Sequence, residues 1–104
     1  MYARFTHIKF LPEHEETARK LFREEVIPEV KKQKGIIDIK LMIPSDKADD
    51  YISVTEWEKK EDADAYAASG VYQKLVDKLK ELYTKKPVLK TYSYDSATIL
   101  TATH

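Results

Sequence analysis

The sequence of 104 residues predicts one α+β domain in which an antiparallel sheet carries helices on one face. Two segments have helical periodicity, and four shorter segments alternate as strands do. Their order is β-α-β-β-α-β, the split βαβ or ferredoxin-like arrangement. Strands are expected at 2–10, 36–43, 51–57 and 88–94, and helical segments at 13–34 and 61–83. The domain is expected to span 1–95, with a tail over 96–104 in which 97–101 is strand-prone.

The first strand is expected to be covered on both faces, because apolar side chains occur at both its odd and its even positions. The helix that follows has an apolar stripe at spacings of three and four, formed by Ala18, Leu21, Phe22, Val26 and Val30. Pro28 interrupts this helix, since it has no N–H for the carbonyl of Glu24. We therefore expect a kink or a break there, and a helix end at Gly35.

The second and third strands are predicted to form a hairpin around the polar loop 44–50. In the second strand, alternation assigns Ile37, Ile39, Leu41 and Ile43 to the core face. In the third strand it assigns Ile52 and Val54 to the core face. The opposite face of that strand then carries Tyr51, Ser53, Thr55 and Trp57.

The second helical region is predicted to consist of two pieces, 61–68 and 71–83, separated by Ser69 and Gly70. The serine can cap the second piece. The buried side of that piece is assigned to Tyr72, Leu75, Val76, Leu79, Leu82 and Tyr83. In the last strand, Val88, Lys90, Tyr92 and Tyr94 share one face.

Composition excludes several classes of function. Lys plus Arg and Asp plus Glu are both 18, so no basic patch of high net charge is available for nucleic acid or an anionic membrane. The chain has no cysteine, which excludes disulfides and thiolate chemistry and suits a cytoplasmic protein. No window has the ~18 apolar residues of a membrane span.

The sheet face that the helices leave uncovered predicts a homodimer. Alternation assigns large side chains to that face, including Tyr51, Trp57 and Tyr92. A second copy is the simplest cover for them. The mixed polar and aromatic character of the face suits an interface between protomers.

Several residues carry a resemblance to a known family: Thr55-Glu56-Trp57-Glu58, then Glu61-Asp62-Ala63, Tyr66, Ser69, Tyr72 and Leu79. These residues resemble the antibiotic biosynthesis monooxygenase (ABM) domain of the dimeric α/β-barrel superfamily. The resemblance covers about 2–94. It implies dimers formed sheet to sheet, and a ligand pocket between each protomer's own sheet and helices. It also implies varied chemistry, including cofactor-free oxygenation and heme degradation.

Within such a pocket, His7 is the best candidate for acid–base catalysis, because imidazole titrates near neutral pH. If the strand has the family's phase, Phe5 and His7 face the pocket together. Trp57 is a candidate flat wall for an aromatic substrate, or a packing residue at the dimer contact. Tyr66 and Tyr72 are candidate substrate contacts, or core tyrosines with hydroxyls at the edge.

No cofactor and no metal are expected. The three histidines are scattered without ligand spacing. Heme-degrading members carry an axial histidine where this chain has Val76, which cannot ligate iron. Arg4, Arg19 and Arg23 could bind an anionic group, or they could pair at the surface with Glu24 or Glu25.

Two functions therefore remain open from the sequence. One is a cofactor-independent monooxygenase of a small aromatic substrate such as a quinol, which requires the protein only to desolvate, orient and deprotonate it. The other is a non-catalytic small-ligand-binding or sensor protein of the same fold.

Overall fold

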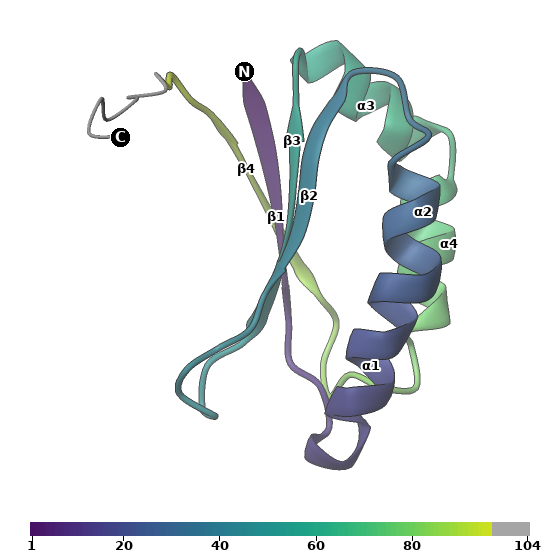
Figure 1. The fold of residues 1–104 in the computed structure, drawn as a ribbon, viewed down its shortest axis with the longest axis vertical. Coiled ribbons are helices and arrows are strands. Elements are labelled where there is room, and N and C mark those ends of the chain that lie inside the picture. The colour runs from purple at the N-terminus through teal and green to yellow at the C-terminus, as the bar shows by residue number, and fades with distance from the viewer. Residues whose placement is uncertain (97–104) are drawn as a thin grey trace, which may run out of the picture.

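The computed structural model describes residues 1–96 and has an α+β, ferredoxin-like fold. Its strands are β1 (Tyr2–Ile8), β2 (Ile36–Met42), β3 (Tyr51–Trp57) and β4 (Val88–Ser93), in the antiparallel order β2-β3-β1-β4. All helices lie on one face of this sheet (Figure 1). The predicted order and layering are thus confirmed. The strand-prone segment 97–101, and the tail beyond residue 96, lie outside the described residues.

The first helical segment changes from α-helical to π-helical hydrogen bonding just before Pro28. It consists of η1 (Pro12–His14), α1 (Glu15–Leu21), the π-helical η2 (Phe22–Val26) and α2 (Ile27–Val30). The N–H of Ile27 bonds the carbonyl of Phe22, five residues back. The expected irregularity at Pro28 therefore takes the form of a wide helical turn. The helical segment ends at Val30, earlier than predicted, and Gly35 follows with φ of +82°.

The second helical segment is divided into two helices at the position that the sequence predicts. It consists of α3 (Lys60–Ala68) and α4 (Val71–Lys78). Between them, Ser69 Oγ donates to the carbonyl of Tyr66 at 2.7 Å and accepts the N–H of Val71 at 3.3 Å. Helix α4 ends at Lys78, short of the predicted Tyr83. Tyr83 instead forms an antiparallel bridge with Phe10.

The predicted facing of β3 is wrong. Trp57 is 0% exposed and stacks on Tyr66 of α3, so it faces the helices. The Tyr51 hydroxyl likewise donates to Glu15 of α1, at 2.8 Å. By alternation, Ile52 and Val54 lie on the opposite face. The prediction failed because small polar side chains at 53 and 55 made the buried face look solvated.

The facing of β1 also differs from the prediction that put Phe5 and His7 toward the helices. The side chains of Arg4, Thr6 and Ile8 take that position instead, as their contacts with α3, α4 and the core show. Phe5 lies on the other face, with its ring 5.3 Å from that of Tyr92. Both faces of β1 carry apolar side chains, so alternation alone could not choose between the two phases.

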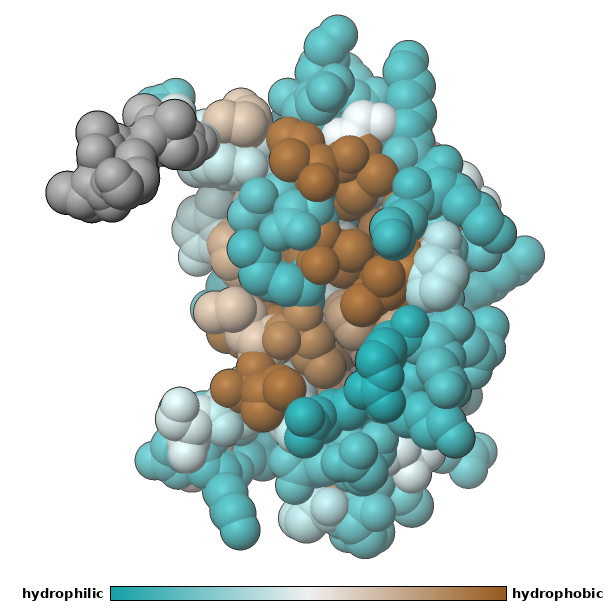
Figure 2. All heavy atoms as spheres, viewed as in Figure 1, coloured by the Kyte–Doolittle hydropathy of each residue, from teal (hydrophilic) through white to brown (hydrophobic). Residues whose placement is uncertain are grey.

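Strand β2 is irregular at its start, where the pairing register with β3 shifts between Ile36 and Asp38. Ile39 and Leu41 pack against the core as predicted, together with Ile36. Ile37 is exposed instead, because a register shift moves a side chain to the other side of a strand. Ile43, also predicted to face the core, is exposed as well, because β2 ends at Met42 just before it. Figure 2 shows apolar side chains gathered along this edge of the molecule, over β2 and toward α2.

Candidate functional site

Three of the predicted site residues meet between the sheet and the helices. The rings of Trp57 and Tyr66 are 5.1 Å apart and tilted by 32°. Tyr72 approaches Tyr66 edge-on, at 6.1 Å and 74°. The indole N–H of Trp57 donates to Thr55 Oγ1 at 2.9 Å, which fixes the indole in the buried layer. The result is an aromatic cluster on the helix-covered face of the sheet.

Arg4 of β1 lies against this cluster. Its guanidinium carbon is 4.8 Å from the ring centre of Tyr72 and 5.7 Å from that of Tyr66, within the range of cation–π attraction. Arg4 is only 6% exposed. One of its terminal nitrogens, Nη2, is buried without a hydrogen-bond partner among the described residues. Such an orphaned charged donor is rare and calls for an explanation.

A small cavity adjoins the cluster. Its walls combine four side chains that carry a hydroxyl with six hydrocarbon ones: Thr6, Ser53, Tyr66 and Tyr72, with Ile8, Phe22, Val26, Leu75, Val76 and Leu79. The hydroxyls of Thr6 and Tyr72 approach each other at 3.4 Å. The volume is about 40 Å³, enough for a few water molecules. Pockets for drug-sized ligands commonly hold ~300–1,000 Å³, so an aromatic ring requires the walls to move.

The wide turn of η2 supplies two of those walls, Phe22 and Val26. Helix α4 supplies Tyr72 and Val76, which are only half-buried. Ser53 of β3 is the other half-buried side chain of the lining, so the cavity is least covered between α4 and β3.

Burial raises the pKa of Tyr66 to about 12, although the nearby Arg4 opposes this rise. A phenol with a raised pKa keeps its proton up to a higher pH, so Tyr66 is neutral throughout the physiological range. Its hydroxyl can therefore donate a hydrogen bond to a ligand. It cannot act as a phenolate base near neutral pH.

Of the predicted site residues, only Tyr66 and Tyr72 line the cavity, and Trp57 packs beside Tyr66 without lining it. His7 and Phe5 lie outside the cavity, and the prediction that they face it is wrong. His7 borders a shallow hollow on the opposite sheet face, together with Met42, Ile43, Pro44, Asp49, Asp50 and Ile52. Phe5 borders a second hollow on that face, beside Tyr92. The sheet separates both side chains from the aromatic cluster.

Arg4 is the residue that sequence reasoning undervalued by grouping it with surface arginines. Arg19 does lie at the surface, since its side chain is 39% exposed and 3.7 Å from that of Glu16. The available signal for Arg4 was its position inside a strand expected to be covered on both faces. A charged residue there has to be buried.

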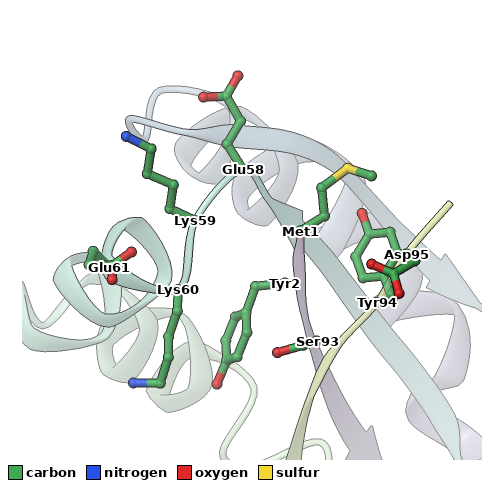
Figure 3. Close-up of a pocket in the computed structure, with 9 residues that line it drawn as sticks. All are labelled: Met1, Tyr2, Glu58, Lys59, Lys60, Glu61, Ser93, Tyr94 and Asp95. Carbon is green, nitrogen blue, oxygen red and sulfur yellow. The ribbon is translucent and has the colours of Figure 1, made fainter.

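A larger hollow of about 380 Å³ lies at the ends of β1 and β4, lined by Met1, Tyr2, Glu58, Lys59, Lys60, Glu61, Ser93, Tyr94 and Asp95. Figure 3 shows Lys60 and Tyr2 on one side of β1 and Tyr94 and Asp95 on the other. The Lys60 ammonium is bound to Asp64 at 2.8 Å. This hollow is an open, charged surface, so we regard the aromatic cluster and its cavity as the candidate site.

The cavity has no imidazole for a metal or for heme. No histidine is among its lining residues, and Val76 presents hydrocarbon there. Within residues 1–96, no three His, Cys, Asp or Glu side chains come together as a metal site. The donor set therefore does not fit an imidazole-ligated heme.

No helix in residues 1–96 is long and apolar enough to cross a bilayer.

Fold and site together define a small ferredoxin-like protein with an internal aromatic pocket. The chain belongs to the antibiotic biosynthesis monooxygenase (ABM) family, whose model matches residues 1–78. Comparison with curated protein sequences gives no match.

Solved structures of low sequence identity share the fold. A protein from Deinococcus radiodurans, assigned as an antibiotic biosynthesis monooxygenase, aligns with a TM-score of 0.80 at 14% identity, covering 98% of this chain and 100% of that one. A conserved protein from Methanosarcina mazei aligns at 0.76 and 19%, covering 91% and 94%. A mutant of MhuD, with two manganese protoporphyrin IX molecules bound per active site, aligns at 0.78 and 17%, covering 94% and 98%.

Proposed function

We propose that this protein is a cofactor-independent monooxygenase that oxidises a small aromatic of the quinol class. The observation that carries the proposal is the cluster of Trp57, Tyr66 and Tyr72 beside a small cavity that Tyr66 and Tyr72 line. Aromatic walls offer edge and face contacts to a flat ring. Membership of the ABM family adds support at the level of the fold.

An ionised quinol can pass an electron to dioxygen directly. The protein then has to hold the ring, exclude water and favour the ionised form. The cavity suits the first two tasks, because apolar side chains make up most of its wall. His7 lies on the opposite sheet face and so does not supply the base in this cavity.

Purified protein is expected to consume oxygen when a suitable quinol is added without flavin or metal. An oxygen electrode measures the rate, with a chelator present and buffer autoxidation subtracted. Val76→Phe is expected to reduce the rate at least ~10-fold, since the larger side chain fills the cavity that it lines. Arg19→Met, at a side chain of α1 that does not line the cavity, is the control and is expected to keep the rate.

Two results would count against this proposal. A panel of quinols with no uptake above autoxidation would reject the activity. A large loss of rate in His7→Ala would move the reaction to the opposite sheet face.

The second candidate is a small-ligand-binding or sensor protein without catalysis. Two observations favour it: the cavity is small, and no histidine or carboxylate lines it. Saturable ligand binding without oxygen uptake would select this candidate. The cytoplasmic location inferred from the lack of cysteine stays a prediction under either function.

We also propose a homodimer formed through the open sheet face. Tyr92 is 54% exposed there, and the exposed Val88 and Met42 share that face with the half-buried Phe5 and Ile52. Tyr51 and Trp57, which the sequence assigned to this interface, face the helices instead. The argument for a partner therefore rests on Tyr92 and its neighbours.

Light scattering after size exclusion is expected to give about twice the 12.1 kDa mass of the chain. Tyr92→Asp is expected to shift the equilibrium toward monomer, because it places a charge in an interface of roughly 1,200–2,000 Å². Lys74→Asp, on the exposed side of α4, is the control and keeps the dimer. A wild-type monomer at micromolar concentration would overturn the proposal.

A further inference from the structure

We propose that the cavity binds its ligand as an anion, with Arg4 as the counter-ion. The ligand is a small planar ring that carries a negatively charged oxygen. This inference rests on the proposed function for the ring, and it adds the charge state and the residue that selects it.

The guanidinium of Arg4 lacks a counter-charge. Its cross-strand neighbours are Thr55 on β3 and Thr91 on β4, and both are neutral. No carboxylate among residues 1–96 lies within 4 Å of it as an ion pair. Nη2 has no hydrogen-bond partner in the same range. Burying a cation is costly unless it is both paired and hydrogen-bonded.

Packing against the neighbouring rings does not offset the whole cost of burying the Arg4 cation. Two tyrosine rings flank the guanidinium, and cation–π attraction offsets part of the cost. It leaves the N–H of Nη2 unsatisfied, and a ring face supplies no full negative charge. The missing partner is therefore an oxyanion. Arginine suits this task, because its planar fork of donors matches carboxylate and related oxygens.

The ligand ring is expected to lie beside Tyr66 and Tyr72. Tyr66 and Tyr72 contact the guanidinium and also line the cavity. Arg4 does not itself line the cavity and its Nη2 is buried, so an oxygen attached to a ring in the cavity reaches Arg4 only when the lining side chains move. The neutral hydroxyl of Tyr66 can donate a further hydrogen bond to that oxygen.

The consequence for a quinol is that no protein base is required. Burial by itself raises the pKa of a phenol, as it does at Tyr66, where Arg4 only opposes the rise. A ligand oxygen bonded directly to Nη2 gains a charged partner that the Tyr66 hydroxyl does not have, and an opposite charge within about 4–6 Å lowers the pKa of an ionisable group by about 1–3. The O–H bond of the bound ring then breaks near neutral pH, and the proton passes to water and buffer. This accounts for a site for oxidation chemistry in which no histidine or carboxylate lines the cavity.

The test uses p-nitrophenol, whose ionised form absorbs visible light. Wild-type protein is expected to lower the pKa of the bound phenol by about 1–3, a preference of about 10- to 1,000-fold for the anion. Arg4→Met is expected to abolish that preference, and Arg4→Lys to retain part of it. Arg19→Met, whose arginine lies beside Glu16 at the surface, is the charge-matched control and keeps it.

The uncharged analogue p-nitroanisole controls for loss of the fold. Its binding is followed by quenching of Trp57, the single tryptophan. Its dissociation constant is expected to be the same in wild type and Arg4→Met. If Arg4→Met does not fold, the wild-type comparison of anion and neutral form still decides. Equal affinities for the two forms would overturn the inference, as would an anion preference that survives Arg4→Met.

Benzoate and benzamide identify the source of the charge. A benzoate preference together with a lowered phenol pKa supports the ionised hydroxyl. Benzoate preference without any shift of the phenol pKa assigns the oxyanion to a carboxylate. These binding measurements do not depend on turnover. An anion preference without oxygen uptake keeps this inference and rejects the oxygenase. Oxygen uptake at the same rate in wild type and Arg4→Met keeps the oxygenase and rejects this inference.

Discussion

Replacing Trp57 with alanine is expected to lower the free energy of unfolding by about 3–5 kcal/mol. The indole is fully buried and belongs to the core cluster that includes Phe22, Val30 and Tyr66. Its removal leaves a cavity where the sheet packs against both helical segments. Total stability of a small domain is only about 5–15 kcal/mol, so a large share is lost. Urea unfolding followed by circular dichroism measures the change.

Two further variants separate the contributions of Trp57. Trp57→Phe keeps an aromatic ring but removes the N–H that donates to Thr55, so a cost of about 1–3 kcal/mol is expected. Leu89→Ala on β4, where the side chain is 38% exposed, is the control and is expected to cost below about 1 kcal/mol. Similar losses for Trp57→Ala and Leu89→Ala would contradict the central position of the indole.

Gly35→Ala is expected to destabilise the protein by more than about 2 kcal/mol. Its φ of +82° is left-handed, which costs about 1–2 kcal/mol for a residue with a Cβ. The new Cβ would also lie 2.7 Å from Cβ of Asp62 and overlap its carboxyl group. The Gly35 carbonyl accepts the N–H of Glu58, just before α3, so the chain has little freedom to move away.

Gly70→Ala is the matched control for that clash. Gly70 has nearly the same φ, +85°, but a Cβ there meets no atom within 4 Å. Its cost is therefore limited to the backbone term of about 1–2 kcal/mol. The difference between the two midpoints in urea isolates the contact with Asp62. Equal costs at both positions would show that the α3 end shifts freely.

The order of elements could be predicted from the sequence because it depends on periodicity within each segment. Which face of a strand is buried could not. In β3, the buried face carries Ser53 and Thr55 beside Tyr51 and Trp57, and the opposite face carries Ile52 and Val54. A polar lining of an internal cavity imitates a solvated surface in the alternation pattern.

The candidate site was predictable only as a list of residue types. The sequence singled out Trp57, Tyr66 and Tyr72, and the structure brings their rings together. His7 was favoured for its chemistry, and Arg4 was discounted because arginines usually lie at the surface. Which of the two faces the helices depends on the phase of β1, a tertiary property. An error of one residue in phase exchanged the candidate acid–base group for a candidate anion receptor.

The small volume of the cavity, about 40 Å³, also limits the affinity that any ligand can reach. A ring fits only those molecules in which side chains such as Tyr72 and Val76 have swung aside. The apparent dissociation constant equals the intrinsic one divided by the fraction of open molecules. If about 1% are open, binding is about 100-fold weaker than the contacts alone provide. Substitutions that loosen α4 without touching the ligand would then tighten binding, and selectivity would depend on how much each ligand stabilises the open form.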